Sequence, residues 1–135
     1  MKVFVDTNVW LSGRFRPGLC ADLLEALLEE DAELLLDERV LSEFTRIASD
    51  KLGVEELPLA RAVLFFRDYT RILPAAAEPT AGIPDSDDAW IMAAALEADA
   101  EWFVTGDKAL LALGQVADLI ILSPRNAYER VRGLA

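Results

Sequence analysis

The chain has 135 residues, a net charge of −11 and no histidine, and 53% of its residues are apolar. This length suits a single domain, spanning residues 1–135, with a core of its own. The lack of histidine excludes most zinc sites and most catalytic triads. The acidity argues against broad, nonspecific coating of nucleic acid, which relies on basic surface.

The sequence gives no sign of a membrane or an export signal. No apolar run approaches the roughly 18 residues that cross a bilayer. The N-terminus reaches Asp6 too early for a signal peptide. The single cysteine, Cys20, rules out an internal disulfide and is consistent with a reducing cytoplasm. We therefore expect a cytoplasmic protein with no membrane contact.

Short apolar runs alternate with segments of helical periodicity along the chain. We expect strands at residues 3–5, 33–36, 70–73, 102–105 and 119–122. We expect helices at residues 18–30, 37–50, 55–68, 85–99, 108–113 and from 124 onward, with loops at 12–17 and 75–84. This alternation predicts an α/β fold with a mainly parallel central sheet flanked by helices. Ligands of such sheets bind beyond the carboxyl ends of the strands.

Two aspartates lie at or just beyond the ends of predicted strands. Asp6 ends the run Val3–Val5, and Asp107 comes shortly after residues 102–105. A carboxylate in apolar sequence is costly to bury unless something compensates its charge. Each aspartate is also a natural N-cap for the helical turn that follows it, so capping is the alternative interpretation.

Two further carboxylates lie on predicted helices. Glu43 lies about 40° from Ile47 on the helical wheel, at the edge of the apolar arc. Its alternative role is to pair with Arg39 or Arg46. Asp88 shares the inward face of its helix near the N-terminus, where the helix dipole stabilises an anion. Its alternative role is in a capping box, for which Asp85 is the better N-cap.

All four carboxylates occupy positions that can meet at one end of a parallel sheet: Asp6, Glu43, Asp88 and Asp107. Like charges gathered there raise one another's pKa unless a cation offsets them. Oxygen ligands without histidine or thiolate suit Mg²⁺ or Mn²⁺. One or two such ions can activate water and stabilise a leaving oxygen in phosphodiester hydrolysis. Thr7, Asn8 and Thr105 are candidates to orient waters or carboxylates around the ion.

These motifs together resemble the PIN-domain nucleases, especially the VapC-like toxins of bacterial and archaeal toxin–antitoxin pairs. The resemblance rests on four segments in the family's order, namely residues 3–9 (VFVDTNV), 41–44 (LSEF), 85–95 (DSDDAWIMAAA) and 104–108 (VTGDK). It spans residues 3 to about 125.

The resemblance implies a PIN-like three-layer sandwich, an Mg²⁺- or Mn²⁺-dependent endoribonuclease and a homodimer. Its acidic site would be Asp6, Glu43, Asp88 and Asp107, assisted by Thr105. The third motif offers Asp85, Asp87 and Asp88, so its metal ligand stays open. A cognate antitoxin would be the protein partner.

Substrate and partner contacts are predicted from the remaining features. Arg14 and Arg16 follow Asp6 closely and are candidates to grip RNA phosphates, with Phe15 between them to stack on a base. Lys108 is a third candidate, and its alternative role is charge balance. The apolar run at residues 62–66 suits an interface with a second copy or an antitoxin, or the core.

Two rival functions fit parts of this pattern. A receiver-like phosphoacceptor domain also uses a parallel sheet, an acidic Mg²⁺ pocket, a threonine and a lysine. Asp37 follows a predicted strand and would be its acceptor, but Glu43 and Asp88 would then have no role. The other rival is a non-catalytic PIN-like module that binds protein.

Overall fold

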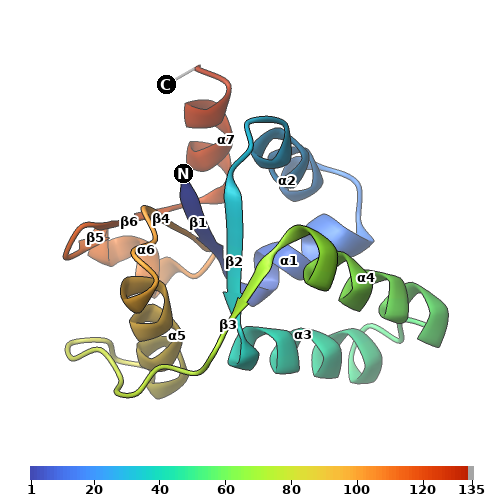
Figure 1. Cartoon of the computed structure of the whole chain (residues 1–135), viewed down its shortest axis with the longest axis horizontal. Coiled ribbons are helices and arrows are strands. Elements are labelled where there is room, and N and C mark those ends of the chain that lie inside the picture. Colours follow the sequence, from blue (N-terminus) through green and yellow to red (C-terminus); the bar gives the residue numbers. More distant parts are fainter. Residues whose placement is uncertain (134–135) are drawn as a thin grey trace.

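The strands form one six-stranded sheet in a computed structural model, which describes residues 1–133 (Figure 1). Their order across the sheet is β3–β2–β1–β4–β6–β5, and all neighbours run parallel except β5 and β6. The strands are β1 (Lys2–Val5), β2 (Glu33–Asp37), β3 (Arg71–Leu73), β4 (Trp102–Val104), β5 (Gln115–Val116) and β6 (Leu119–Leu122). The predicted α/β architecture is confirmed, and among the strands only the short edge strand β5 was not expected.

Helices cover both faces of the sheet. They are α1 (Thr7–Phe15), α2 (Leu19–Glu29), α3 (Glu38–Asp50), α4 (Glu56–Tyr69), α5 (Ser86–Glu97), α6 (Lys108–Leu113) and α7 (Pro124–Val131). Figure 1 shows α5 and α6 on one side and α1 to α4 on the other. Right-handed crossovers explain this, because the chain moves outward from β1 to β3 and then returns across the sheet to β4. No helix within residues 1–133 has the length and apolar character needed to cross a bilayer.

The loop predicted at residues 12–17 is wrong over most of its length, because α1 continues to Phe15. Glycine inside a helix costs up to about 1 kcal/mol, so Gly13 favoured a break. Here Gly13 lies against α2 so closely that a Cβ atom would come within 2.4 Å of Leu24 Cδ1. The helix also buries Trp10 completely. The burial on α1 outweighs the poor helix propensity of the glycine.

A cluster of aromatic rings joins α1, α3 and α4. The ring of Phe66 makes edge-on contacts with Trp10 and with Phe44, each with 4.8 Å between ring centroids. Phe15 stacks on Phe44 at 5.4 Å. Phe15 is half-buried and packs its ring against the core, so the structure does not support the expectation that it stacks on a base.

Candidate active site

The end of β1 places Asp6 inside the protein, where it is only 7% exposed. Its Oδ1 accepts a hydrogen bond from the backbone N–H of Thr7 at 2.8 Å, which caps α1. Its Oδ2 accepts a bond from the Thr105 hydroxyl at 2.7 Å. The carboxylate is thus held from two strand ends, because β1 and β4 are parallel neighbours.

Thr105 also connects Asp6 to Asp107. The Thr105 hydroxyl oxygen accepts a bond from the backbone N–H of Asp107 at 3.0 Å. Asp107 Oδ1 then accepts bonds from the N–H groups of Ala109 and Leu110 and caps α6. Asp6 and Asp107 are therefore both helix caps and neighbours at the edge of the sheet.

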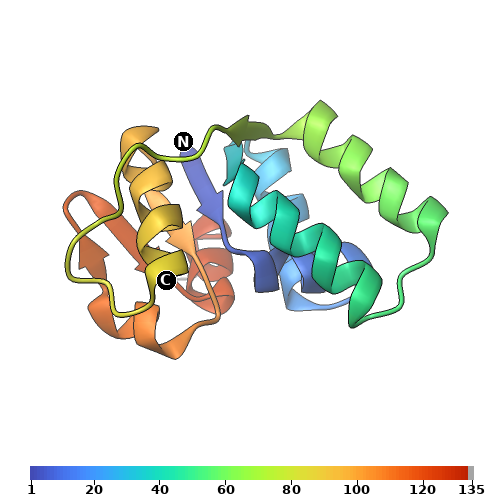
Figure 2. The same ribbon diagram turned by 90° about the horizontal axis from the view of Figure 1, so that it is seen from below.

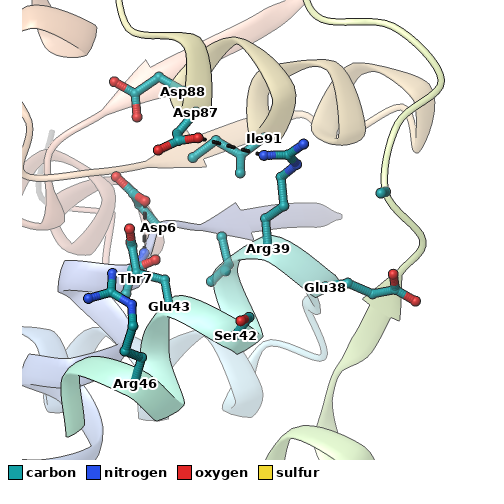
Figure 3. Close-up of a pocket in the computed structure, with 12 residues that line it drawn as sticks. Asp6, Thr7, Glu38, Arg39, Ser42, Glu43, Arg46, Asp87, Asp88 and Ile91 are labelled. Carbon is teal, nitrogen blue, oxygen red and sulfur yellow. Dashed lines mark hydrogen bonds and ion pairs between the residues drawn. The ribbon is translucent and has the colours of Figure 1, made fainter. Parts of the chain in front are cut away.

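A cleft of about 480 Å³ opens at this edge, between α3 and α5. Seen from below in Figure 2, these two helices flank the end of β1. Asp6 and Thr7 line the cleft, together with Glu43 from α3 and Asp88 from α5 (Figure 3). Asp85 caps α5 through the N–H groups of residues 87 and 88, as predicted, which leaves the Asp88 side chain free to face the cleft.

The carboxylates around the cleft repel one another. Burial raises the pKa of the Asp6 carboxyl, and the charges of Glu43 and Asp107 add to this rise against the hydrogen bonds from Thr105 and Thr7. Burial also raises the pKa of Asp88 to about 6. The carboxylates that add to the Asp88 shift are Asp85, Asp6, Asp107 and Glu43. Four acidic side chains, from α3, α5 and the caps of α1 and α6, are therefore close enough to interact electrostatically.

The donor atoms at the cleft fit a hard divalent cation, since they are carboxylate and hydroxyl oxygens. The Thr7 hydroxyl is buried beside Asp6 and has no hydrogen-bond partner within residues 1–133, as expected of a group that binds a metal-bound water. In the same residues, no three acidic side chains are grouped closely enough to ligate one ion as they stand.

Comparison with protein families decides the identity of the fold. The family model described as "PIN domain" matches residues 2–109, which is most of the chain. This chain belongs to the PIN domain family. A comparison with curated proteins finds no significant match.

Solved structures resemble this PIN domain along nearly its full length. VapBC2 from Rickettsia felis, bound to a promoter DNA fragment, has a TM-score of 0.68 at 18% identity, covering 91% of this chain and 98% of that chain. FitAcB from Neisseria gonorrhoeae has a TM-score of 0.59 at 21% identity, covering 91% and 98%. VapBC-1 from nontypeable Haemophilus influenzae has a TM-score of 0.60 at 17% identity, covering 93% and 99%. At these identities the likeness concerns the fold.

Several side chains predicted at the site of this PIN domain point elsewhere. The guanidinium carbon of Arg14 lies 4.0 Å from the centre of the Phe65 ring, in a separate hollow between α1, α2 and α4. Asn8 and Arg16 line a third hollow, between α1 and α3. Lys108 is exposed at the start of α6 and does not line the cleft. The continuation of α1 past Gly13 explains the place of Arg14, because its helical position turns it toward α2 and α4.

Other side chains of the cleft were missed or undervalued by sequence reasoning. Arg39 and Arg46 line it from α3, and the sequence had suggested them only as partners for Glu43. No ion pair to Glu43 within 4.0 Å is present in the described part of the chain. The signal that could have found them is spacing, because residues 39, 43 and 46 share one face of a helix.

Asp37 bears on the receiver-like alternative. It ends β2, but its side chain is completely buried and its Oδ1 accepts a bond from the N–H of Val40, which caps α3. A phosphoacceptor has to be reached by its phosphodonor. Burial of Asp37 therefore disfavours the receiver-like function for this PIN domain.

The raised pKa of Asp88 predicts a pH-dependent stability in the absence of metal. Because this pKa is about 6 in the folded chain against an ordinary 3.8, the folded state holds more protons than the unfolded state between these values. The free energy of unfolding is then expected to fall as the pH rises from about 4 to about 6. Asp88→Asn removes this contribution, so it is expected to flatten the decline.

Urea unfolding in chelator at pH 4.5 and pH 6.5 measures how far the free energy of unfolding falls over this pH range. Asp50→Asn, which makes the same chemical change at an exposed position on α3, is the matched control. The assignment is wrong if Asp88→Asn and Asp50→Asn change the pH dependence equally.

Proposed function

We propose that this PIN domain is a metal-dependent endoribonuclease that hydrolyses RNA phosphodiester bonds at the cleft between α3 and α5. The observation that carries the proposal is that Asp6, Glu43 and Asp88 line one cleft at the edge of the sheet. Asp107 does not line the cleft, but its charge adds to the pKa rise of Asp6 and Asp88. An acidic cleft of this kind repels an RNA strand unless a cation is bound. The membership in the PIN domain family supports the same chemistry.

The four carboxylates would hold Mg²⁺ or Mn²⁺, which lowers the pKa of a bound water and stabilises negative charge on the leaving oxygen. The chain's own residues prepare this site. The Thr7 amide and the Thr105 hydroxyl fix the orientation of Asp6, so little rearrangement is needed there. The Thr7 hydroxyl, which is free of other bonds within residues 1–133, would donate to a water in the cleft.

Metal removal tests the proposal. The purified protein is expected to cut a single-stranded RNA in the presence of Mg²⁺ or Mn²⁺ and to stop when a chelator is added, because the carboxylates alone cannot offset the charge of the phosphodiester. The DNA strand of the same sequence tests the preference for RNA. Cleavage that continues in chelator, or no cleavage of any RNA with either ion, would contradict the proposal.

We further propose that the chain is the toxin of a toxin–antitoxin pair and that it forms a homodimer. The sequence resembles VapC-like toxins, and two of the similar solved structures are VapBC assemblies. On α4, Leu57 and Leu64 are 61% and 44% exposed, which suits a protein contact. Light scattering of the chain, alone and co-expressed with a small reading frame just upstream of its gene, measures both associations.

A further inference from the structure

Two arginines stand on either side of Glu43 along one face of α3. Arg39, Glu43 and Arg46 are spaced i, i+4 and i+7, so they lie within about 60° of one another around the helix. The two arginines are about 10 Å apart along the helix axis, at 1.5 Å per residue. All three line the acidic cleft, and Figure 3 shows Arg46 beside Glu43 and Arg39 on its other side.

Arg39 makes only weak contacts, so an anionic ligand can replace them. Its Nη1 lies 3.6 Å from Asp87 Oδ1 on α5, across the mouth of the cleft. The two side chains are 41% and 80% exposed, and ion pairs this exposed contribute little to stability. The guanidinium carbon also lies 4.9 Å from the centre of the Trp90 ring, which holds the charge at the cleft without neutralising it.

The Arg46 side chain is less constrained than that of Arg39. It is exposed, and within residues 1–133 it makes no ion pair of 4.0 Å or less. Its guanidinium is therefore available to an anionic ligand at the Glu43 end of the cleft. Arg14, by contrast, stacks on Phe65 in another hollow, so it cannot serve this cleft as placed.

We propose that Arg39 and Arg46 bind two phosphates of the RNA strand, one on each side of the phosphodiester bond that is cut beside Glu43. This rests on the proposed ribonuclease function. A chain of net charge −11 repels RNA overall, so positively charged side chains in the cleft must position the strand. A guanidinium matches a phosphate with two parallel hydrogen bonds, which gives direction as well as attraction. Arg39 exchanges Asp87 for phosphate when the strand enters.

RNA binding by an uncleaving protein tests this inference. Fluorescence anisotropy of a labelled single-stranded RNA is measured with Asp6→Asn as the parent, in a fixed excess of Mn²⁺ and at several salt concentrations. Arg39→Gln and Arg46→Gln are each expected to weaken binding about tenfold. Each is also expected to reduce the slope of log K against log salt by about 0.7, the value for one lost phosphate contact on a single strand. The matched control is Arg130→Gln, an exposed arginine in the last turn of α7, which is expected to leave both quantities unchanged.

A second variant separates phosphate binding from a structural role. Asp87→Asn breaks the same ion pair as Arg39→Gln but keeps the arginine. If Arg39 binds phosphate, Asp87→Asn is expected to bind RNA at least as tightly as the parent. If the ion pair only holds α3 to α5, both variants weaken binding equally and the inference is overturned for Arg39.

The remaining outcomes distinguish failure of this inference from failure of the proposed function. Arginine variants that bind RNA as tightly as the parent, with unchanged salt slopes, overturn the inference and leave the ribonuclease function standing. A parent that binds no RNA while the wild type cuts it does the same, because the parent keeps both arginines. A parent and wild type that bind no RNA and cut none overturn the proposed function, and the inference with it.

Discussion

Asp6→Asn is expected to lower kcat/KM for RNA cleavage by at least about a hundredfold, because it removes a carboxylate from the centre of the proposed metal site. Loss of a group that merely orients a metal ligand already costs 10- to 100-fold in many sites. Initial rates in Mn²⁺, with protein purified in the same way as the wild type, measure this loss. The Asp50→Asn protein, changed at an exposed position of α3, is expected to cut like the wild type.

The same substitution is expected to leave the fold intact. The amide oxygen of asparagine can still accept the bond from the Thr7 N–H, and its NH₂ group can donate to the Thr105 hydroxyl. Burial raises the pKa of Asp6, so the ionised carboxylate is costly at neutral pH and a neutral amide removes that cost. The metal-free variant should therefore melt at or above the wild-type temperature, and added Mn²⁺ should stabilise it less.

Two results would overturn this assignment. Cleavage by Asp6→Asn at the wild-type rate would show that the site lies elsewhere. An intact biological effect in cells together with lost cleavage would favour the non-catalytic binding module.

Phe44→Ala is expected to lower the free energy of unfolding by about 3–5 kcal/mol, the usual cost of truncating a buried phenylalanine. Phe44 is fully buried and touches the rings of Phe15 and Phe66, so its loss opens a cavity between α1, α3 and α4. The free energy of unfolding of a domain of this size is about 5–15 kcal/mol, so this loss brings the variant close to unfolding. Its neighbour Glu43 would also be less firmly placed.

Urea unfolding in chelator measures this change without a contribution from bound metal. Phe44→Leu keeps most of the apolar volume and is expected to cost less than half as much. A loss under about 1 kcal/mol for Phe44→Ala would show that the aromatic cluster does not hold α3 in place.

The sequence could indicate the carboxylates of the candidate site because their positions follow from local rules. A buried strand ending at Val5 puts Asp6 at the edge of the sheet, and a helix cap at Asp85 leaves Asp88 facing inward. The edge of a parallel sheet then collects such groups from distant parts of the chain. The fold class followed from the same alternation of strands and helices.

The cationic side chains could not be found in the same way. Arg14 and Arg16 are near Asp6 in sequence, but α1 turns them into two other hollows. Arg39 and Arg46 are far from Asp6 in sequence, and only the packing of α3 beside the end of β1 brings them to it. Nearness along the chain is a poor guide here, because a helix redirects its side chains by 100° at each residue.

The sequence by itself determined the alternation of strands and helices, and it indicated Asp6, Glu43, Asp88 and Asp107 as a candidate site, since periodicity, capping and the cost of burying charge act over short stretches of chain. The tertiary structure alone decided that Gly13 stays inside a helix, that the half-buried Phe15 packs against the core and that Arg39 and Arg46 face the acidic cleft. Those outcomes depend on which helix faces meet across the sheet, and close packing between distant segments outweighs local preference.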